Sequence, residues 1–224
     1  MKNKVNISWK MWELHSSLKL ILTVVFVVAL LVSNVVTWRQ VEFPFWIVVT
    51  WAVLIFPITY ILSDVFSEVY GYKWSRITCY LWFACNLFMS LIFMAVINMK
   101  APDYFVNAGA YSTALWNTWR ILVSSLLAYV LWDFVNDKIF QKMKLKHPND
   151  NKWFGRRAIL SSLVWEMIDS WIFIPLAFIW TMPTKTLLIM IVTQVVLKVL
   201  YEIIILPLTV FVTRKVQNYE NSLN

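Results

Sequence analysis

Charged and amide side chains recur at helical spacing inside segments that are otherwise apolar enough to span a lipid bilayer. Within each set the members lie three or four residues apart, so each set occupies one face of a helix. A charge at the centre of a bilayer costs roughly 2.5 kcal/mol or more, and packing alone does not require it. These residues therefore predict a polar site inside a membrane protein, used for transport or for intramembrane chemistry. The three sets are Asp64 with Glu68, Glu166 with Asp169, and Gln194 with Lys198 and Glu202.

Asp169 and Lys198 each lie near the middle of a long apolar segment. One interpretation is a buried ion pair between them that fixes how two helices align. The other is that both groups line a substrate cavity, and the two are compatible because an empty site can store its charges as an internal pair. Lys198 can instead pair with Glu202, four residues further along its own helix. Gln194 shares their face and offers both a donor and an acceptor.

Asp64, Glu68 and Asn34 can also be explained without a role in the polar site. Asp64 and Glu68 lie near the end of an apolar segment, where carboxylates commonly meet a basic residue such as Lys73 or Arg76. Asn34, in the first apolar segment, makes either a hydrogen bond between helices or a contact in the site. We keep Asp64 and Asn34 as candidate site residues.

Aromatic residues could complement these carboxylates. Trp51, Trp165 and Trp171 lie deep in apolar segments, where an indole can stack on a flat heterocycle, although core packing is the commoner role. The sequence has no GxSxG, HExxH, P-loop or GxGxxG motif. Both histidines, His15 and His147, lie outside the apolar segments. We therefore expect a protein that is not an enzyme and that uses neither a cofactor nor a metal.

The composition is that of a membrane protein. The chain has 224 residues, of which 60% are hydrophobic and 14% are charged, whereas soluble domains carry about 25% charged residues. The net charge of +8 comes from basic residues in short segments between apolar runs. That distribution is a topology signal and does not predict a nucleic-acid partner. Cys79 and Cys85 lie in one apolar run, so neither a disulfide framework nor a metal site is expected.

Six apolar runs of about 20 residues predict six membrane-spanning helices. They cover about Leu18–Thr37, Phe45–Val65, Ile77–Ile97, Trp116–Phe134, Ala158–Trp180 and Leu187–Val212. The first run is interpreted as a retained helix, because no small-residue cleavage pattern follows it. The chain then divides into an amino-terminal segment, 1–17, a transmembrane domain, 18–213, and a tail, 214–224.

Lysine and arginine set the expected orientation. The two ends, the second-to-third loop and the fourth-to-fifth loop together hold fifteen of them, and the alternate loops hold four. By the positive-inside rule, both termini are predicted to be cytoplasmic in a multi-pass protein of the inner membrane. The basic run from Lys138 to Arg157 is interpreted as a solvated loop on the anionic membrane face.

The predicted fold class is an all-α membrane protein, in which six helices divide into two groups of three. An odd group size would invert the second copy, as in many small transporters. A loose echo supports this option, because the middle helix of each half has a proline and an acid, Pro57 with Asp64 and Pro175 with Asp169. Proline frees a backbone carbonyl, so we expect irregular points at these prolines and at Pro207.

The second apolar run carries a resemblance to a known family. It contains FPITYILSD at 56–64 followed by VFSEVYG at 65–71. This string resembles the signature of the YhhQ-type queuosine precursor transporter family, formerly labelled putative vitamin uptake transporters. The resemblance extends from about Leu18 to Val212 through further elements in the same order. They are Arg120-Ile121, Ala128-Tyr129, Asp169 in a Ser-Asp or Asp-Ser element, Lys198-Val199-Leu200 and Leu206-Pro207.

The resemblance implies uptake of 7-deazaguanine compounds, namely preQ0, preQ1 or queuine. Such a ring presents N–H donors and a carbonyl, which a carboxylate and a Lys or Gln can answer. Some family members carry a basic residue in place of Glu68 and an acid in place of Gln194, so these positions are expected to tune substrate choice. The candidate site is Asp169, Glu166, Gln194, Lys198 and Glu202, followed by Asp64 and Asn34.

Three functions remain open. The first is a small-molecule transporter that works alone or as a homodimer in the bilayer. The second is the substrate-binding membrane subunit of an ATP-driven vitamin-type importer, whose nucleotide-binding partner would be a separate chain. The third is a membrane protein that does not transport.

Overall fold

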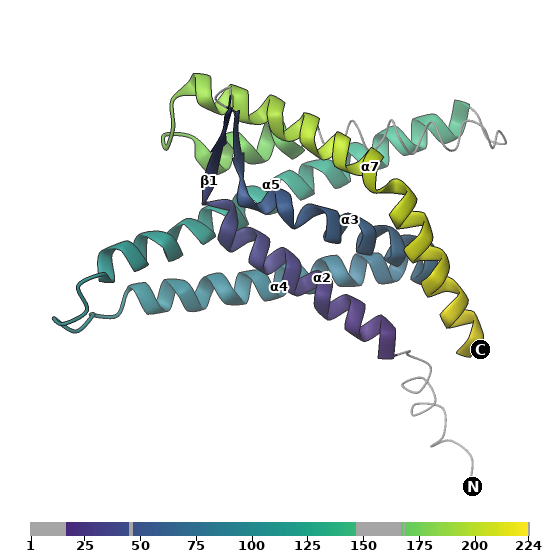
Figure 1. Ribbon diagram of the computed structural model, residues 1–224, viewed down its shortest axis with the longest axis horizontal. Helices are drawn as coiled ribbons and strands as arrows, with labels where there is room; N and C mark the ends of the chain where they lie inside the picture. Colours follow the sequence, from purple (N-terminus) through teal and green to yellow (C-terminus); the bar gives the residue numbers. More distant parts are fainter. Residues whose placement is uncertain (1–16, 45–46, 147–166, 168, 224) are drawn as a thin grey trace, which may run out of the picture.

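The chain is built mainly of helices, and a short β-hairpin lies near one end of the molecule. A computed structural model describes residues 17–44, 47–146, 167 and 169–223 (Figure 1). The elements are α2 (Ser17–Thr37), β1 (Gln40–Phe43), β2 (Ile47–Thr50), the 3₁₀-helix η2 (Trp51–Leu54), α3 (Phe56–Val65), the π-helix η3 (Phe66–Tyr70), α4 (Gly71–Ile97), α5 (Ala108–Lys146) and α7 (Thr184–Leu223). A further apolar helix, Asp169–Phe178, lies between α5 and α7.

Apolar side chains face outward and polar side chains face inward, the reverse of a water-soluble protein. On α2, Leu20 is 65% exposed, while Asn34 is only 7% exposed. On α7, Ile204 is 69% exposed, whereas Gln194 and Lys198 are buried. Since lipid tails solvate apolar surface, this distribution fits a protein whose helices lie in a bilayer and keep their polar groups inside.

Three helical stretches in the described part are long and apolar enough to cross a membrane. They are Ser17–Thr37, Phe56–Ile97 and Thr184–Ser222, and the shorter Asp169–Phe178 is also apolar. A multi-pass membrane protein is therefore supported. The count of six crossings and the inverted repeat remain predictions.

The second predicted span is wrong in its first half, and the fold is not entirely helical. Residues Ile47–Thr50 form a strand that pairs antiparallel with Gln40–Phe43. The run Ile-Val-Val-Thr is β-branched throughout, and such residues favour strands over helices. Two residues of the strand, Val49 and Thr50, are buried, at 1% and 2% exposed. Burial inside the protein is the condition under which non-helical backbone is tolerated at membrane depth.

Pro57 and Gly71 mark where the second apolar run begins and ends as a helix. Pro57 lies in the first turn of α3, where its missing N–H has no intrahelical role, so it starts a helix and does not bend one. Gly71 adopts φ +78°, a backbone conformation that favours glycine. The chain reverses there, so that α3 and α4 run in opposite directions (Figure 1). Lys73 and Arg76, predicted to lie in a loop, belong to α4.

The later helices are longer than the sequence predicted. Helix α5 continues to Lys146, so the first part of the basic run that begins at Lys138 is helical and not a loop. The rest of that run and the first half of the predicted fifth span lie outside the described residues. Helix α7 continues without interruption past Pro207 to Leu223.

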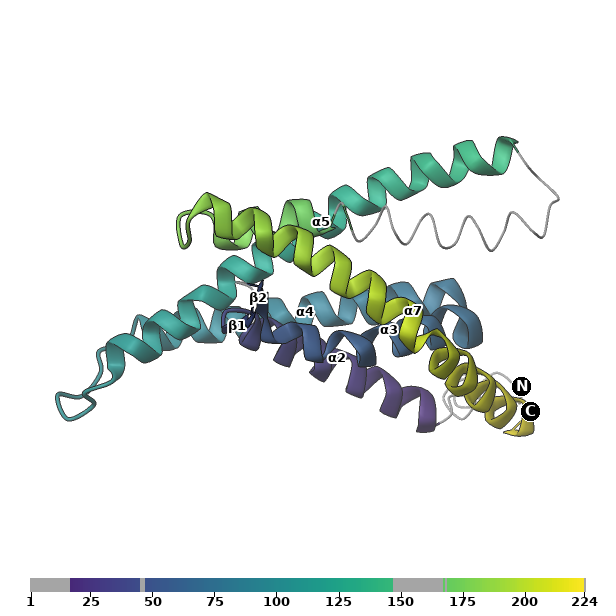
Figure 2. The same ribbon diagram turned by 45° about the horizontal axis from the view of Figure 1, so that its top comes forward.

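The apolar core lies where α5, the helix Asp169–Phe178 and α7 meet the hairpin end of the molecule (Figure 2). Phe178 is fully buried and stacks on Trp38, with ring centroids 5.6 Å apart. Arg120 of α5 donates hydrogen bonds to the carbonyls of Leu176 and Ile179. It thereby satisfies carbonyls that a helix end leaves without partners.

Candidate functional site

A cavity of about 260 Å³ lies where the helices converge. Helices α2, α3, α4, α5 and α7 contribute to it, as do Thr50 of the hairpin and the helix Asp169–Phe178. Its volume is slightly below the usual range of roughly 300–1,000 Å³ for small-molecule sites, so it suits a compact ligand. The lining residues are Phe26, Leu30, Ser33, Asn34, Thr37, Thr50, Phe56, Thr59, Tyr60, Cys79, Trp82, Ser125, Tyr129, Asp169, Ser170, Phe173, Ile174, Gln194 and Lys198.

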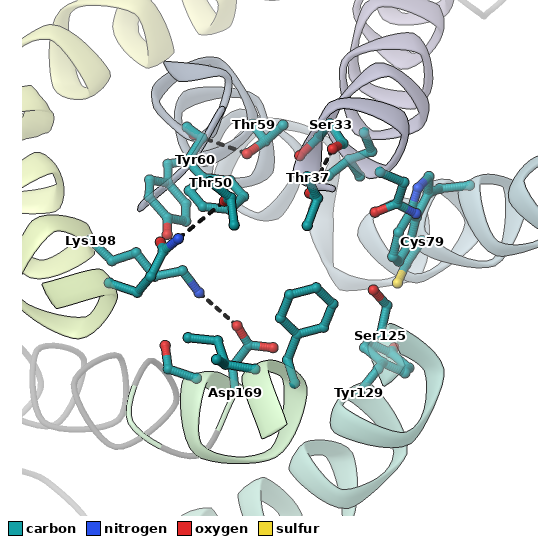
Figure 3. A pocket seen from close by; sticks show the side chains of 18 of the residues that line it. Ser33, Thr37, Thr50, Thr59, Tyr60, Cys79, Ser125, Tyr129, Asp169 and Lys198 are labelled. Atoms are coloured by element: carbon teal, nitrogen blue, oxygen red, sulfur yellow. Dashed lines mark hydrogen bonds and ion pairs between the residues drawn. The ribbon is translucent and has the colours of Figure 1, made fainter. Parts of the chain in front are cut away.

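An ion pair between two helices lies on one wall of this cavity. The Lys198 ammonium donates a hydrogen bond to Oδ2 of Asp169 at 2.6 Å (Figure 3). The two side chains are 9% and 21% exposed. The Lys198 ammonium also lies 5.2 Å from the centre of the Phe56 ring, a cation–π contact. Asp169 is therefore a partner of Lys198 across the helix interface, and the salt bridge faces the space a ligand would fill.

Gln194 connects this wall to the hairpin. It lies one turn before Lys198 on α7, and its Nε2 donates to Oγ1 of Thr50 at 3.1 Å. The β-hairpin is thus what brings Thr50 to the site, because a continuous helix through residues 45–65 would place it differently.

Four buried polar atoms of lining residues have no hydrogen-bond partner among the described residues. They are Asn34 Nδ2, Trp82 Nε1, Ser170 Oγ and Gln194 Oε1. A buried polar atom without a partner costs roughly 1–3 kcal/mol. Since they surround a cavity, a polar ligand or ordered water that pairs with them would recover this free energy.

Aromatic rings form much of the remaining surface of the cavity. Of the tryptophans considered from the sequence, Trp51 and Trp171 are not among the lining residues and are 43% and 54% exposed. Trp165 lies outside the described residues. The rings that do line the cavity are Phe26, Phe56, Tyr60, Trp82, Tyr129 and Phe173.

The structure brings together four of the seven candidate residues: Asn34, Asp169, Gln194 and Lys198 all line the cavity. Asp64 and Glu202 do not line it within the described part of the chain. Each lies one helical turn beyond a lining residue, on α3 after Tyr60 and on α7 after Lys198, and their carboxylates interact electrostatically with each other. Glu166 lies outside the described residues. Whether any of them binds substrate stays a prediction.

Sequence reasoning did not identify Thr50, Trp82 or Ser170. The sequence predicts a helix around Thr50, and the signal for Ser170 is its place after Asp169 in the Asp-Ser element. Trp82 does have a signal in the sequence, because it lies four residues before Asn86 on α4, and Asn86 is fully buried. A polar stripe inside an apolar helix marks its inward face, and Trp82 lies on that face.

The fold and the cavity define a class of protein: a helical, multi-pass membrane protein that encloses a polar site among its helices. Residues 50–212 match the family described as "Putative vitamin uptake transporter". The chain belongs to this transporter family, and the resemblance seen in the sequence is confirmed.

A curated relative supports the same assignment. The chain is 22% identical over 160 residues to a protein of Bacillus subtilis (strain 168) named "Probable queuosine precursor transporter". The match covers 71% of this chain and 69% of the relative. No solved structure matches the chain significantly.

Proposed function

We propose that this chain imports a 7-deazaguanine base, a precursor of queuosine, through the cavity that contains Asp169 and Lys198. The observation that carries the proposal is that both members of this ion pair line the cavity. An ammonium donor beside a carboxylate acceptor is complementary to a ring edge with a carbonyl next to an N–H group. A guanine-like ring has that edge, with its carbonyl beside one ring N–H and an amino group.

Binding of the ring would replace the contact between Lys198 and Asp169 by contacts of similar strength between each of these residues and the ring. The Lys198 ammonium would donate to the ring carbonyl, and the Asp169 carboxylate would accept from the ring N–H and amino groups. Neither charge is left without a partner in the empty or the loaded protein, which avoids the large cost of an isolated buried charge. The aromatic lining offers faces on which a flat ring can stack.

The expected placement is in the inner membrane, with six crossings and both termini in the cytoplasm. The fifteen-to-four split of basic residues supports it. The start of α2 and the end of α7 lie toward the same end of the molecule (Figure 1), as an even number of crossings requires.

Uptake by cells that cannot make queuosine tests the function. Expression of this chain should allow such cells, supplied with a 7-deazaguanine at low concentration, to restore queuosine in their tRNA. No gain over empty vector at any concentration would exclude the proposal. Purified protein in liposomes without ATP then separates the alternatives. Uptake there favours a self-sufficient transporter, whereas binding without uptake favours the membrane subunit of an ATP-driven importer.

A further inference from the structure

Four elements meet in one set of contacts at the end of the molecule where α2 begins and α7 ends. The Tyr70 hydroxyl of η3 donates a hydrogen bond to Oε1 of Glu220 on α7 at 2.6 Å. The Lys19 ammonium of α2 lies 5.3 Å from the centre of the Tyr70 ring and 3.7 Å from the centre of the Trp74 ring on α4. Trp74 also donates from Nε1 to Oγ1 of Thr23 on α2 at 3.3 Å. We call these five residues the polar cluster.

Charge strengthens the contacts of the polar cluster. The Glu220 carboxylate accepts from Tyr70 and also attracts the Lys19 ammonium. Lys19 in turn lies over two aromatic rings, whose faces attract a cation. One ammonium, one phenol and one carboxylate therefore hold the beginning of α2, the end of η3 and the end of α7 together.

Aromatic rings lie between the polar cluster and the cavity. Phe26, which lines the cavity, packs edge-on against Phe66 with ring centroids 5.4 Å apart. Phe66 is only 1% exposed, and its ring centroid lies 6.3 Å from that of Tyr70. From the cavity toward this end of the molecule, the contacts are thus aromatic first and then polar.

The polar cluster lies close to the cavity along two of the helices. On α2, Lys19 comes seven residues before Phe26, and on α4, Trp74 comes five residues before Cys79, which also lines the cavity. With a rise of about 1.5 Å per residue, these separations are about 10 Å and about 8 Å along the helix axes. The polar cluster is therefore near enough to obstruct the way between the cavity and this end of the molecule.

Helix α7 carries polar residues on one face between the cavity and the polar cluster. Thr209 is 7% exposed, and Oγ1 of Thr213 is buried without a hydrogen-bond partner among the described residues. Spacings of eleven, four and seven residues, each close to whole helical turns, connect Lys198 through these two threonines to Glu220. A polar solute that leaves the cavity in this direction would meet this polar face of α7.

We propose that the polar cluster, together with Phe66, is a gate that closes the cavity toward the end carrying the carboxy terminus. The gate rests on the proposed function, since a transporter must close its central site to one face of the membrane while the site is open to the other. A gate opens repeatedly, and a few polar and cation–π contacts can break and re-form at modest cost.

The connectivity of the polar cluster suits a gate. Each of its contacts joins two different elements, so breaking them allows α2, η3, α4 and α7 to separate at this end. The first turns of α7 belong to the apolar core at the hairpin end, through residues such as Met190. Pro207 lies on α7 between that core and Glu220. Because a proline removes one hydrogen bond of the helix, bending there costs less, and the end of α7 can move while its beginning stays packed.

Cys79 can report on this gate because it lines the cavity and is not in a disulfide (Figure 3). In a Cys85→Ser protein it is the one remaining cysteine of the chain. A membrane-impermeant maleimide is applied to right-side-out or inverted vesicles, and a carboxy-terminal tag marks the face. Tyr70→Phe removes the hydrogen bond to Glu220 and keeps the ring. It should raise the labelling rate of Cys79 about tenfold, from the face of the carboxy terminus only.

Tyr72→Phe is the matched control, because Tyr72 lies close by on α4 and is 66% exposed. It loses the same hydroxyl outside the polar cluster and should not change the labelling rate. Glu220→Gln keeps an acceptor for Tyr70 but removes the charge that attracts Lys19. A smaller rise from the same face is therefore expected, and this variant decides the question if Tyr70→Phe does not fold.

Three results would overturn the gate. They are an unchanged rate in Tyr70→Phe and Glu220→Gln, an equal rise from both faces, and the same rise in Tyr72→Phe. Labelling requires no substrate, so it tests the gate separately from the proposed function. A failure of that function would instead appear as a wild-type protein that takes up no 7-deazaguanine.

Discussion

Replacing Asp169 by asparagine is expected to abolish uptake while leaving the protein folded in the membrane. The change exchanges one of two carboxylate oxygens for an NH₂ donor, so a substrate's N–H groups meet a donor. A hydrogen bond to a charged group contributes about 1.5–3 kcal/mol. Losing one of these bonds outright, while the other becomes a bond to a neutral amide, lowers affinity by at least about tenfold. The initial rate of uptake of a labelled 7-deazaguanine, measured at low concentration and normalised to protein in the membrane, gives the result.

Asp103→Asn is the matched control for this experiment, because Asp103 lies exposed in the loop between α4 and α5. It makes the same chemical change away from the cavity and should transport normally. Normal uptake by Asp169→Asn would remove Asp169 from the site. Aggregation of that variant, in place of an inactive folded protein, would instead assign Asp169 a structural role.

The polar half of the candidate site was accessible from sequence because lipid penalises each of its residues. A lysine and an aspartate in consecutive apolar segments, 29 residues apart, each near mid-span, are placed at similar depth by the helices themselves. The structure puts them in contact. Asn34 and Gln194 could be predicted for the same reason, since a buried amide in an apolar helix needs a partner.

The hairpin was not accessible from hydropathy. A window over residues 45–65 has the apolar content of a span, whether it folds as one helix or as a strand, a 3₁₀ turn and a short helix. The four β-branched residues that begin at Ile47 indicate a strand, and Pro57 indicates the start of a helix. The sequence nevertheless predicts one span here, because the apolar run is long enough to cross a membrane. The hairpin is part of the site, because it places Thr50 within hydrogen-bonding distance of Gln194.

Aromatic positions illustrate a second limit. The depth of a residue in the bilayer can be estimated from its position in an apolar run. The direction in which its side chain points around the helix depends on the neighbouring helices, which the sequence does not give. Trp51 and Trp171 face outward, while Trp82, on the buried polar stripe of α4, lines the cavity. Spacing relative to buried polar residues was the better guide to direction, because polar groups turn away from lipid.

Separating the two charges of the ion pair is expected to destabilise the protein more than removing both. Lys198→Met and Asp169→Asn each remove one charge of this buried pair and leave the other in place, at a cost of roughly 3–5 kcal/mol. The double variant removes both charges and should unfold at a higher temperature than either single variant, although it should remain inactive. The thermal unfolding of the wild type, the two single variants and the double variant, measured in the same detergent, gives the coupling free energy between the two residues. Uptake is measured in parallel.

A control cycle uses Lys185→Met with Asp169→Asn, because Lys185 is exposed in the first turn of α7. Sites that share no contact are additive within about 0.5 kcal/mol, so this cycle should show no coupling. If the Lys198 cycle were also additive, the contact with Asp169 would not contribute to stability. Lys198 would then act through Glu202 or through the substrate carbonyl alone. A Lys198→Met protein with normal stability and normal uptake would move the substrate site along α3 toward Asp64, since Lys198 is the only cation that the described residues place on the cavity.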